Sequence, residues 1–83
     1  MYKCSLIHYN GVIANVWHFE AGSVVASIER GDDIVRDLLR KTENYGDVWT
    51  EAPADNPTSA GTIVQRWAID NGEYFELWVP LSR

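Results

Sequence analysis

The sequence predicts a single α+β domain over residues 1–83, built from an antiparallel sheet with one helix packed on one face. Two β-rich runs are each interrupted by a turn sequence, Asn-Gly at 10–11 and Asp-Asn-Gly at 70–72, and such turns join antiparallel strands. One stretch, at about residues 32–44, repeats apolar residues at helical spacing. A hydrophobic fraction of 46% over 83 residues is typical of one small globular domain.

Residues 2–19 form the first predicted hairpin. Asn10-Gly11 suits a type I′ two-residue loop, which pairs Tyr9 with Val12. The alternation of side chains then predicts a core face made of Tyr2, Cys4, Leu6, Ile13, Trp17 and Phe19. The opposite face is more apolar than a solvated face needs to be, and includes Ile7, Tyr9, Val12 and Val16.

Residues 23–29 alternate apolar and other residues with a period of two, which favours a third strand in a meander. A helix that begins at Ser23 as its N-cap is the alternative. The sequence leaves both open, because periodicity is a weak signal over so short a run.

The predicted helix spans about residues 32–44. Gly31 is expected to break whatever precedes it, and Asp32 or Asp33 is a suitable N-cap. Asn44-Tyr45-Gly46 is the expected stop. Two i,i+4 ion pairs are expected to support the helix, each by a few tenths of a kcal/mol: Asp32 with Arg36 and Asp37 with Lys41.

Residues 47–50 read as a short strand or extended segment, and residues 52–61 as a loop with two prolines. The last hairpin follows at residues 62–81. A two-residue turn there would set Asp70 opposite Glu73, and like charges directly opposite are unfavourable. We therefore predict a three-residue loop with Gly72 left-handed.

In that register Trp67 opposes Phe75 and Arg66 opposes Glu76. The core face of this hairpin is then predicted to carry Ile63, Trp67, Ile69, Phe75, Leu77 and Val79. The other face mixes large aromatic residues with an ion pair, and carries Val64, Arg66, Ala68, Tyr74, Glu76 and Trp78.

No catalytic or metal-binding arrangement is evident in the sequence. His8 and His18 fall on opposite faces of the first hairpin, and Cys4 lies about 13 Å from His8 along the strand. Phosphate-loop, dinucleotide, zinc and calcium patterns are absent. We therefore expect a chain that is not an enzyme and needs no metal or cofactor.

The net charge of −5 and the pI near 4.7 disfavour direct binding to nucleic acid. A single cysteine fits a reducing compartment. Neither a membrane-spanning run nor a signal peptide is evident. These features predict a cytoplasmic protein without a membrane partner.

An acidic stretch recurs at every fourth residue and has no basic residue within it: Glu43, Asp47, Glu51 and Asp55. Gly46 and Pro53 argue against one continuous helix here. The stretch is either a solvated loop or a patch that presents carboxylates to a basic groove on a partner protein.

One helix covers only one face of such a sheet. The uncovered face is therefore a second candidate for partner binding, through Tyr9, Val12, Val16, Tyr74, Glu76 and Trp78. The alternative is that the long loop folds across this face, with Trp49 as a lid.

This architecture of turn-joined hairpins at both ends, a central Asp-capped helix and no catalytic residues resembles the small phage-encoded inhibitor proteins of the anti-CRISPR type. The resemblance implies a non-catalytic inhibitor that occupies a functional surface of a larger complex, such as a basic nucleic-acid-binding one, in the host cytoplasm. The alternatives are an assembly protein that forms a homodimer through the exposed sheet face and, least favoured by the acidic charge, a sheet that stacks single-stranded nucleic acid.

Overall fold

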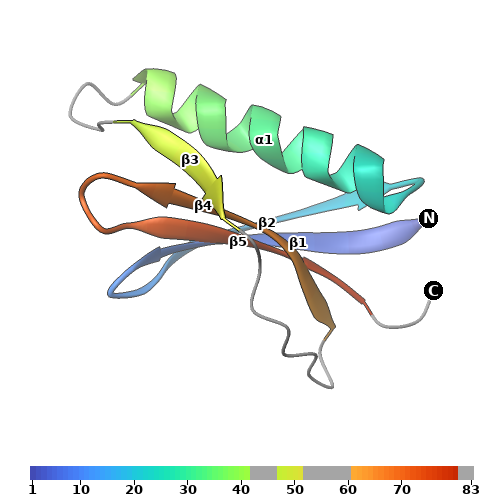
Figure 1. The fold of residues 1–83 in the computed structure, drawn as a ribbon. Coiled ribbons are helices and arrows are strands. Elements are labelled where there is room, and N and C mark those ends of the chain that lie inside the picture. The colour runs from blue at the N-terminus through green and yellow to red at the C-terminus, as the bar shows by residue number, and fades with distance from the viewer. Residues whose placement is uncertain (42–46, 52–60, 81–83) are drawn as a thin grey trace.

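The computed structural model describes residues 1–41, 47–51 and 61–80. The strands in these ranges form one antiparallel sheet in the order β2-β1-β5-β4-β3. One helix lies across one face of the sheet, as Figure 1 shows, so the predicted α+β class is confirmed. The elements are β1 (Tyr2–Asn10), β2 (Val12–Ala21), α1 (Val24–Lys41), β3 (Val48–Glu51), β4 (Thr62–Ile69) and β5 (Tyr74–Val79).

The predicted pairing of Tyr9 with Val12 in the first hairpin is wrong. Tyr9 pairs with Ile13, and the register shifts between His8 and Tyr9. Gly11 has a φ of 76° but Asn10 does not have a positive φ, so the loop is not type I′. The shift places Ile13 beside Tyr9 instead of in the core, and its side chain is 59% exposed.

The predicted third strand at residues 23–29 is also wrong, because α1 already begins at Val24. The alternative with Ser23 as N-cap is confirmed: the Ala26 N–H donates to Ser23 Oγ at 3.1 Å. Ala26 and Ile28 pack against the hydrophobic core from this first part of the helix. Contacts with the sheet therefore select a helix where the two-residue period favours a strand.

Gly31 and Asp32 lie inside α1 instead of at its start. A Cβ on Gly31 would lie 2.9 Å from Cη2 of Trp67, so the indole packs directly on the helix backbone. Asp32 is not an N-cap, and its Oδ1 accepts a hydrogen bond from Trp67 Nε1 at 3.1 Å. Gly31 and Asp32 thus form the contact site of Trp67 on α1, here called the Trp67 seat. These contacts offset the helix-propensity cost of glycine, about 1 kcal/mol.

The two predicted i,i+4 ion pairs of α1 are confirmed. Arg36 Nε lies 2.8 Å from Asp32 Oδ2, and Lys41 Nζ lies 3.1 Å from Asp37 Oδ2. Arg36, Asp37 and Lys41 are exposed, so solvent screens both pairs. Residues 42–44 of the predicted helix, and the predicted stop that follows, lie outside the described residues.

The predicted three-residue loop of the last hairpin is confirmed. The Ile69 N–H donates to Glu73 O at 3.0 Å, and Gly72 has a φ of 91°. Trp67 pairs with Phe75, and Arg66 pairs with Glu76.

At the far end of this hairpin the register shifts between Ile63 and Gln65. Ile63 therefore pairs with Trp78, and Val64 packs against the core. The predicted face positions of Ile63 and Val64 are thus exchanged. Such an irregularity inserts one residue and reverses the alternation beyond it.

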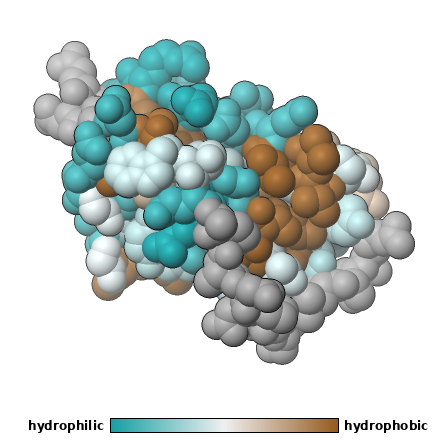
Figure 2. All heavy atoms as spheres, viewed as in Figure 1, coloured by the Kyte–Doolittle hydropathy of each residue, from teal (hydrophilic) through white to brown (hydrophobic). Residues whose placement is uncertain are grey.

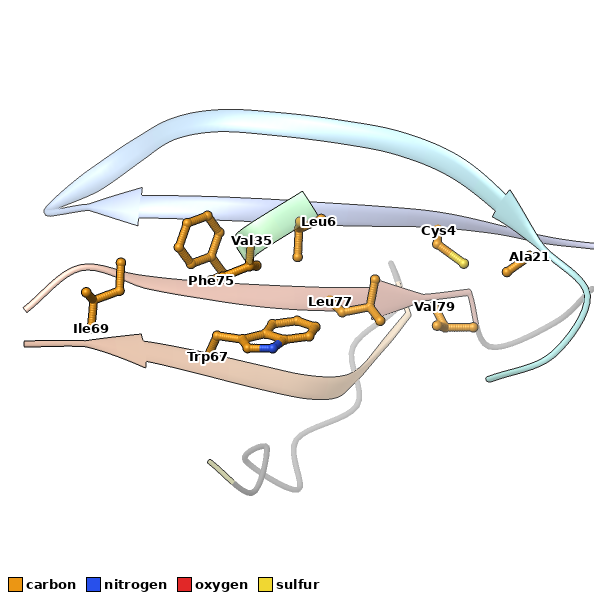
Figure 3. Close-up of a cluster of buried hydrophobic side chains, with 9 residues drawn as sticks. All are labelled: Cys4, Leu6, Ala21, Val35, Trp67, Ile69, Phe75, Leu77 and Val79. Atoms are coloured by element: carbon orange, nitrogen blue, oxygen red, sulfur yellow. The ribbon is translucent and has the colours of Figure 1, made fainter. Parts of the chain in front are cut away.

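The core lies between α1 and the face of the sheet that we call the inner face, and Figure 3 shows its buried side chains. Trp67 and Phe75 are among its largest fully buried side chains, and Val35 reaches them from α1. The predicted short strand is confirmed as β3, which pairs with β4. The buried cluster comprises Cys4, Leu6, Ala21, Val35, Trp67, Ile69, Phe75, Leu77 and Val79.

Candidate binding face

The face of the sheet that points away from α1, here called the outer face, is the main candidate site (Figure 1). Directly paired residues share a face, so the strand register defines its members. The register arranges them in three rows across the strands: Ile13, Tyr9, Tyr74, Ala68 and Trp49; Val16, Ile7, Glu76, Arg66 and Glu51; His18, Ser5, Trp78 and Ile63.

An aromatic stack forms the centre of the outer face. The rings of Tyr9 and Tyr74 lie 4.7 Å apart at an interplanar angle of 18°. The guanidinium carbon of Arg66 lies 4.2 Å from the centroid of the Tyr74 ring. Stacking and cation–π contacts of this kind contribute about 0.5–1 kcal/mol each, so the three side chains hold one another in place.

Two acidic residues of the outer face, Glu51 and Glu76, flank Arg66 of this stack. Arg66 Nε lies 3.9 Å from Glu51 Oε1 on β3, so the salt bridge joins Arg66 to Glu51. The predicted ion pair with Glu76, which is also directly opposite Arg66, is not found among the described contacts. Burial and then the negative charge of Glu76 raise the pKa of Tyr9 above its ordinary value. Tyr9 is therefore a neutral hydrogen-bond donor across the physiological pH range.

One buried donor on the outer face, Arg66 Nε, lacks a hydrogen-bond partner within the described ranges. At 3.9 Å, Glu51 is too far from Arg66 Nε for a hydrogen bond. An unpaired buried donor costs about 1–3 kcal/mol.

Exposed apolar side chains gather along β2. Val12, Ile13 and Val16 are 74%, 59% and 41% exposed. Trp49, on β3 at the other side of the sheet, is also exposed. In Figure 2, which views the molecule from the side as in Figure 1, hydrophilic residues dominate over α1, and hydrophobic residues gather in the half where α1 begins.

Five of the six predicted sheet-face residues share the outer face: Tyr9, Val16, Tyr74, Glu76 and Trp78. Val12 does not, because it pairs with Asn10 at the hairpin tip while Ile13 lies beside Tyr9. The sequence did not indicate Ile13 as a member of this face, because no residue type in the hairpin marks the position of the register shift. It also missed Trp49 as a member of the face, although its alternation with Val48 in a short strand would have indicated a place there.

The structure describes only half of the predicted acidic stretch. Glu43 and Asp55 lie outside the described residues. Asp47, just before β3, donates its N–H to Asp70 Oδ2 at 3.1 Å, and the Asp70 N–H donates to Asp47 O at 3.3 Å. These bonds tie the start of β3 to the β4–β5 turn, while Glu51 at its other end faces Arg66.

The histidines and the cysteine lie apart, as predicted. His8 is buried on the inner face, stacked on Phe75 with its Nε2 at 2.6 Å from Glu73 Oε1. His18 lies on the outer face, 3.1 Å from Ser5 Oγ. Burial raises the pKa of the Cys4 thiol, which keeps it protonated. Within residues 1–41, 47–51 and 61–80, no group of three His, Cys, Asp or Glu side chains is placed to hold a metal ion.

A cleft of about 550 Å³ lies between α1 and β2. Two basic and two acidic residues line the cleft, so their charges balance. The lining residues are Trp17, His18, Phe19, Arg30, Asp33, Ile34, Asp37 and Arg40.

The described part of the chain contains no helix with the length and hydrophobicity that crossing a membrane requires. Comparison with protein-family models, with curated proteins and with solved structures finds no match for this chain. A function for this chain is therefore inferred from the geometry of the outer face.

Proposed function

We propose that this protein is a non-catalytic binding protein whose outer face docks onto a partner protein. The observation that carries the proposal is the aromatic stack of Tyr9 and Tyr74 with Arg66, on the side of the sheet that α1 leaves uncovered. Tyrosine, tryptophan and arginine are the residues most enriched at the energetic centres of protein interfaces.

The charge of the outer face favours a protein over a nucleic acid as the partner. Its single arginine, Arg66, is accompanied by Glu51 and Glu76, and the chain carries a net charge of −5. Phosphate backbones are bound through an excess of basic residues, which this face lacks. A basic protein surface, by contrast, would be attracted at long range.

The inhibitor that the anti-CRISPR resemblance implies is the specific form of this proposal. In that form the outer face covers a functional surface of a larger complex, such as its nucleic-acid-binding surface. Asp47 and Glu51 add negative charge at the β3 side of the face. Such a complex would weaken as salt is raised, because exposed charges are screened.

The experiment is affinity capture from the native cell with the tagged full chain, followed by mass spectrometry and by measurement of the affinity of the captured protein. The test variant is Tyr74→Ala combined with Trp78→Ala. The matched control is Val25→Ala, which removes an apolar side chain 67% exposed on α1, away from the outer face. We expect the double variant to lose the captured protein and the control to retain it; equal capture by both would overturn the proposal.

Two further variants test the charged form. Asp47→Lys and Glu51→Lys reverse charges at the two ends of β3, so both should weaken binding to a basic partner and reduce the salt dependence of the affinity. An unchanged affinity in both would exclude the charged form while leaving the aromatic form in place. The alternative occupant of the outer face is a second copy of the chain, and sedimentation of the double variant against the wild type detects it.

A further inference from the structure

The two Asn-Gly dipeptides of the chain lie at hairpin tips at the same end of the sheet. Asn10-Gly11 stands where β1 turns into β2, and Asn71-Gly72 lies in the turn between β4 and β5. The end of β1 pairs with the start of β5, so both tips lie at one end of the sheet in Figure 1. Asparagine before glycine is prone to lose its side-chain amide, because glycine has no Cβ to keep its backbone nitrogen away from the asparagine carboxamide.

Hydrogen bonds hold the carboxamide of Asn71 and the nitrogen that would attack it. Asn71 Oδ1 accepts a hydrogen bond from the Glu73 N–H at 2.9 Å, and Asn71 Nδ2 donates to Glu73 Oε2. The Gly72 N–H donates to Ile69 O at 3.0 Å. The Gly72 nitrogen and the Asn71 carboxamide therefore meet only when this turn opens and these hydrogen bonds break.

The other dipeptide, Asn10-Gly11, lacks these restraints. Within residues 1–41, 47–51 and 61–80, no hydrogen bond is found for the Asn10 side chain or for the Gly11 N–H. Both residues are exposed, and nothing lies within 4 Å of the place that a Cβ on Gly11 would take. The Asn10 carboxamide and the Gly11 nitrogen can therefore approach each other through rotations at the exposed tip, while the rest of the chain stays folded.

We propose that Asn10 is a site of spontaneous deamidation, and that the folded chain protects Asn71 from the same reaction. The backbone nitrogen of Gly11 loses its proton and attacks Cγ of Asn10. The new N–Cγ bond forms, the bond between Cγ and Nδ2 breaks, and Nδ2 takes up a proton and leaves as ammonia. Water then opens the resulting succinimide at either carbonyl group, which gives aspartate or isoaspartate at position 10.

The hairpin tip has room for either product. Both products add a negative charge, and isoaspartate also lengthens the backbone by one carbon atom. Val12, the next residue, is 74% exposed, so the longer backbone displaces no core side chain. Tyr9 and Ile13 pair next to the tip, and the modification therefore lies beside the outer face. The proposal concerns the covalent chemistry of the tip and does not rest on the outer face as a docking surface.

Incubation of the full chain in mildly alkaline buffer tests the proposal, with trypsin digestion and mass spectrometry at successive times. Trypsin cleaves after lysine and arginine, so Asn10 falls in the peptide 4–30 and Asn71 in the peptide 67–83. The same measurement on the chain unfolded in urea gives the reference rates, which depend only on the neighbouring residues. Folding should slow Asn71 at least about tenfold more than it slows Asn10, because only Asn71 must break hydrogen bonds to react.

Two matched variants assign the reaction to its residue. Asn10→Gln keeps the amide but would have to close a larger ring, so it should remove the modification of the folded chain. Asn71→Gln should leave that modification unchanged. Equal slowing of Asn10 and Asn71 by folding overturns the proposal, and so does a folded chain in which Asn10 stays intact. Modification of the peptide 4–30 that persists in Asn10→Gln would assign the reaction to Asn15 and would also overturn it.

Discussion

The inner and outer faces of the sheet draw aromatic residues from the same two strands, β4 and β5, yet the two sets have opposite roles. On the inner face Trp67 is 1% exposed and packs on Gly31 of α1. On the outer face Tyr74 and Trp78 are only partly buried, and α1 does not cover them. Strand alternation supplies both faces equally, and the single apolar stripe of α1 decides which one becomes the core. Stability should therefore reside in the inner face and recognition in the outer face.

The largest effect should come from truncating the inner-face indole. Trp67→Ala removes a fully buried side chain and its bond to Asp32, and should lower the free energy of unfolding by about 3–5 kcal/mol, measured by urea denaturation. Trp78→Ala makes the same change on the outer face and should cost about 1 kcal/mol. Equal losses in the two variants would break the comparison.

A methyl group added under the same indole tests how closely α1 packs. Gly31→Ala gains helix propensity of about 1 kcal/mol but sets its Cβ against Trp67, for a net destabilisation of about 1–3 kcal/mol in the same assay. Gly22→Ala is the control, because nothing lies within 4 Å of its Cβ. A stabilised Gly31→Ala would show that the helix can shift away from the sheet without cost.

The polar part of the Trp67 seat should have a smaller effect. Asp32→Ala leaves Trp67 Nε1 without its acceptor and should cost about 1–2 kcal/mol of unfolding free energy. Asp33→Ala, on the neighbouring exposed residue, is the control and should change stability little. Near-ultraviolet circular dichroism should report the altered indole environment in Asp32→Ala alone. If the two variants lost the same stability, the hydrogen bond would have no role in holding α1.

The smallest effect should appear on the outer face at alkaline pH. The pKa of Tyr9 is raised in the folded state by burial and by Glu76, so the folded chain holds this proton more tightly than the unfolded chain. Its contribution is complete below the unfolded pKa of about 10 and is lost as pH rises through the folded pKa. Tyr9→Phe should therefore flatten the decline in stability above that pH, measured by thermal melts; an unchanged slope would contradict this coupling.

Much of the fold follows from local sequence signals. The turn at 70–72 and the repulsion between Asp70 and Glu73 predict the register of the last hairpin from the turn back to Gln65, because both act between neighbours in the chain. The i,i+4 pairs of α1 are predictable for the same reason. Most of the outer face follows from strand alternation once the register is known.

The sequence by itself therefore determined the α+β class, the β4–β5 register from Gln65 to the turn, and five of the six predicted outer-face residues. Only the tertiary structure decided that residues 24–31 are helical, that Ile13 and not Val12 lies beside Tyr9, and that Arg66 pairs with Glu51. Each of these depends on a partner distant in the chain: the seat of Trp67 on Gly31, the pairing of β1 with two strands, and the position of β3 beside β4. Contacts between residues so far apart in the chain produce no periodic pattern in the sequence, so periodicity does not predict them.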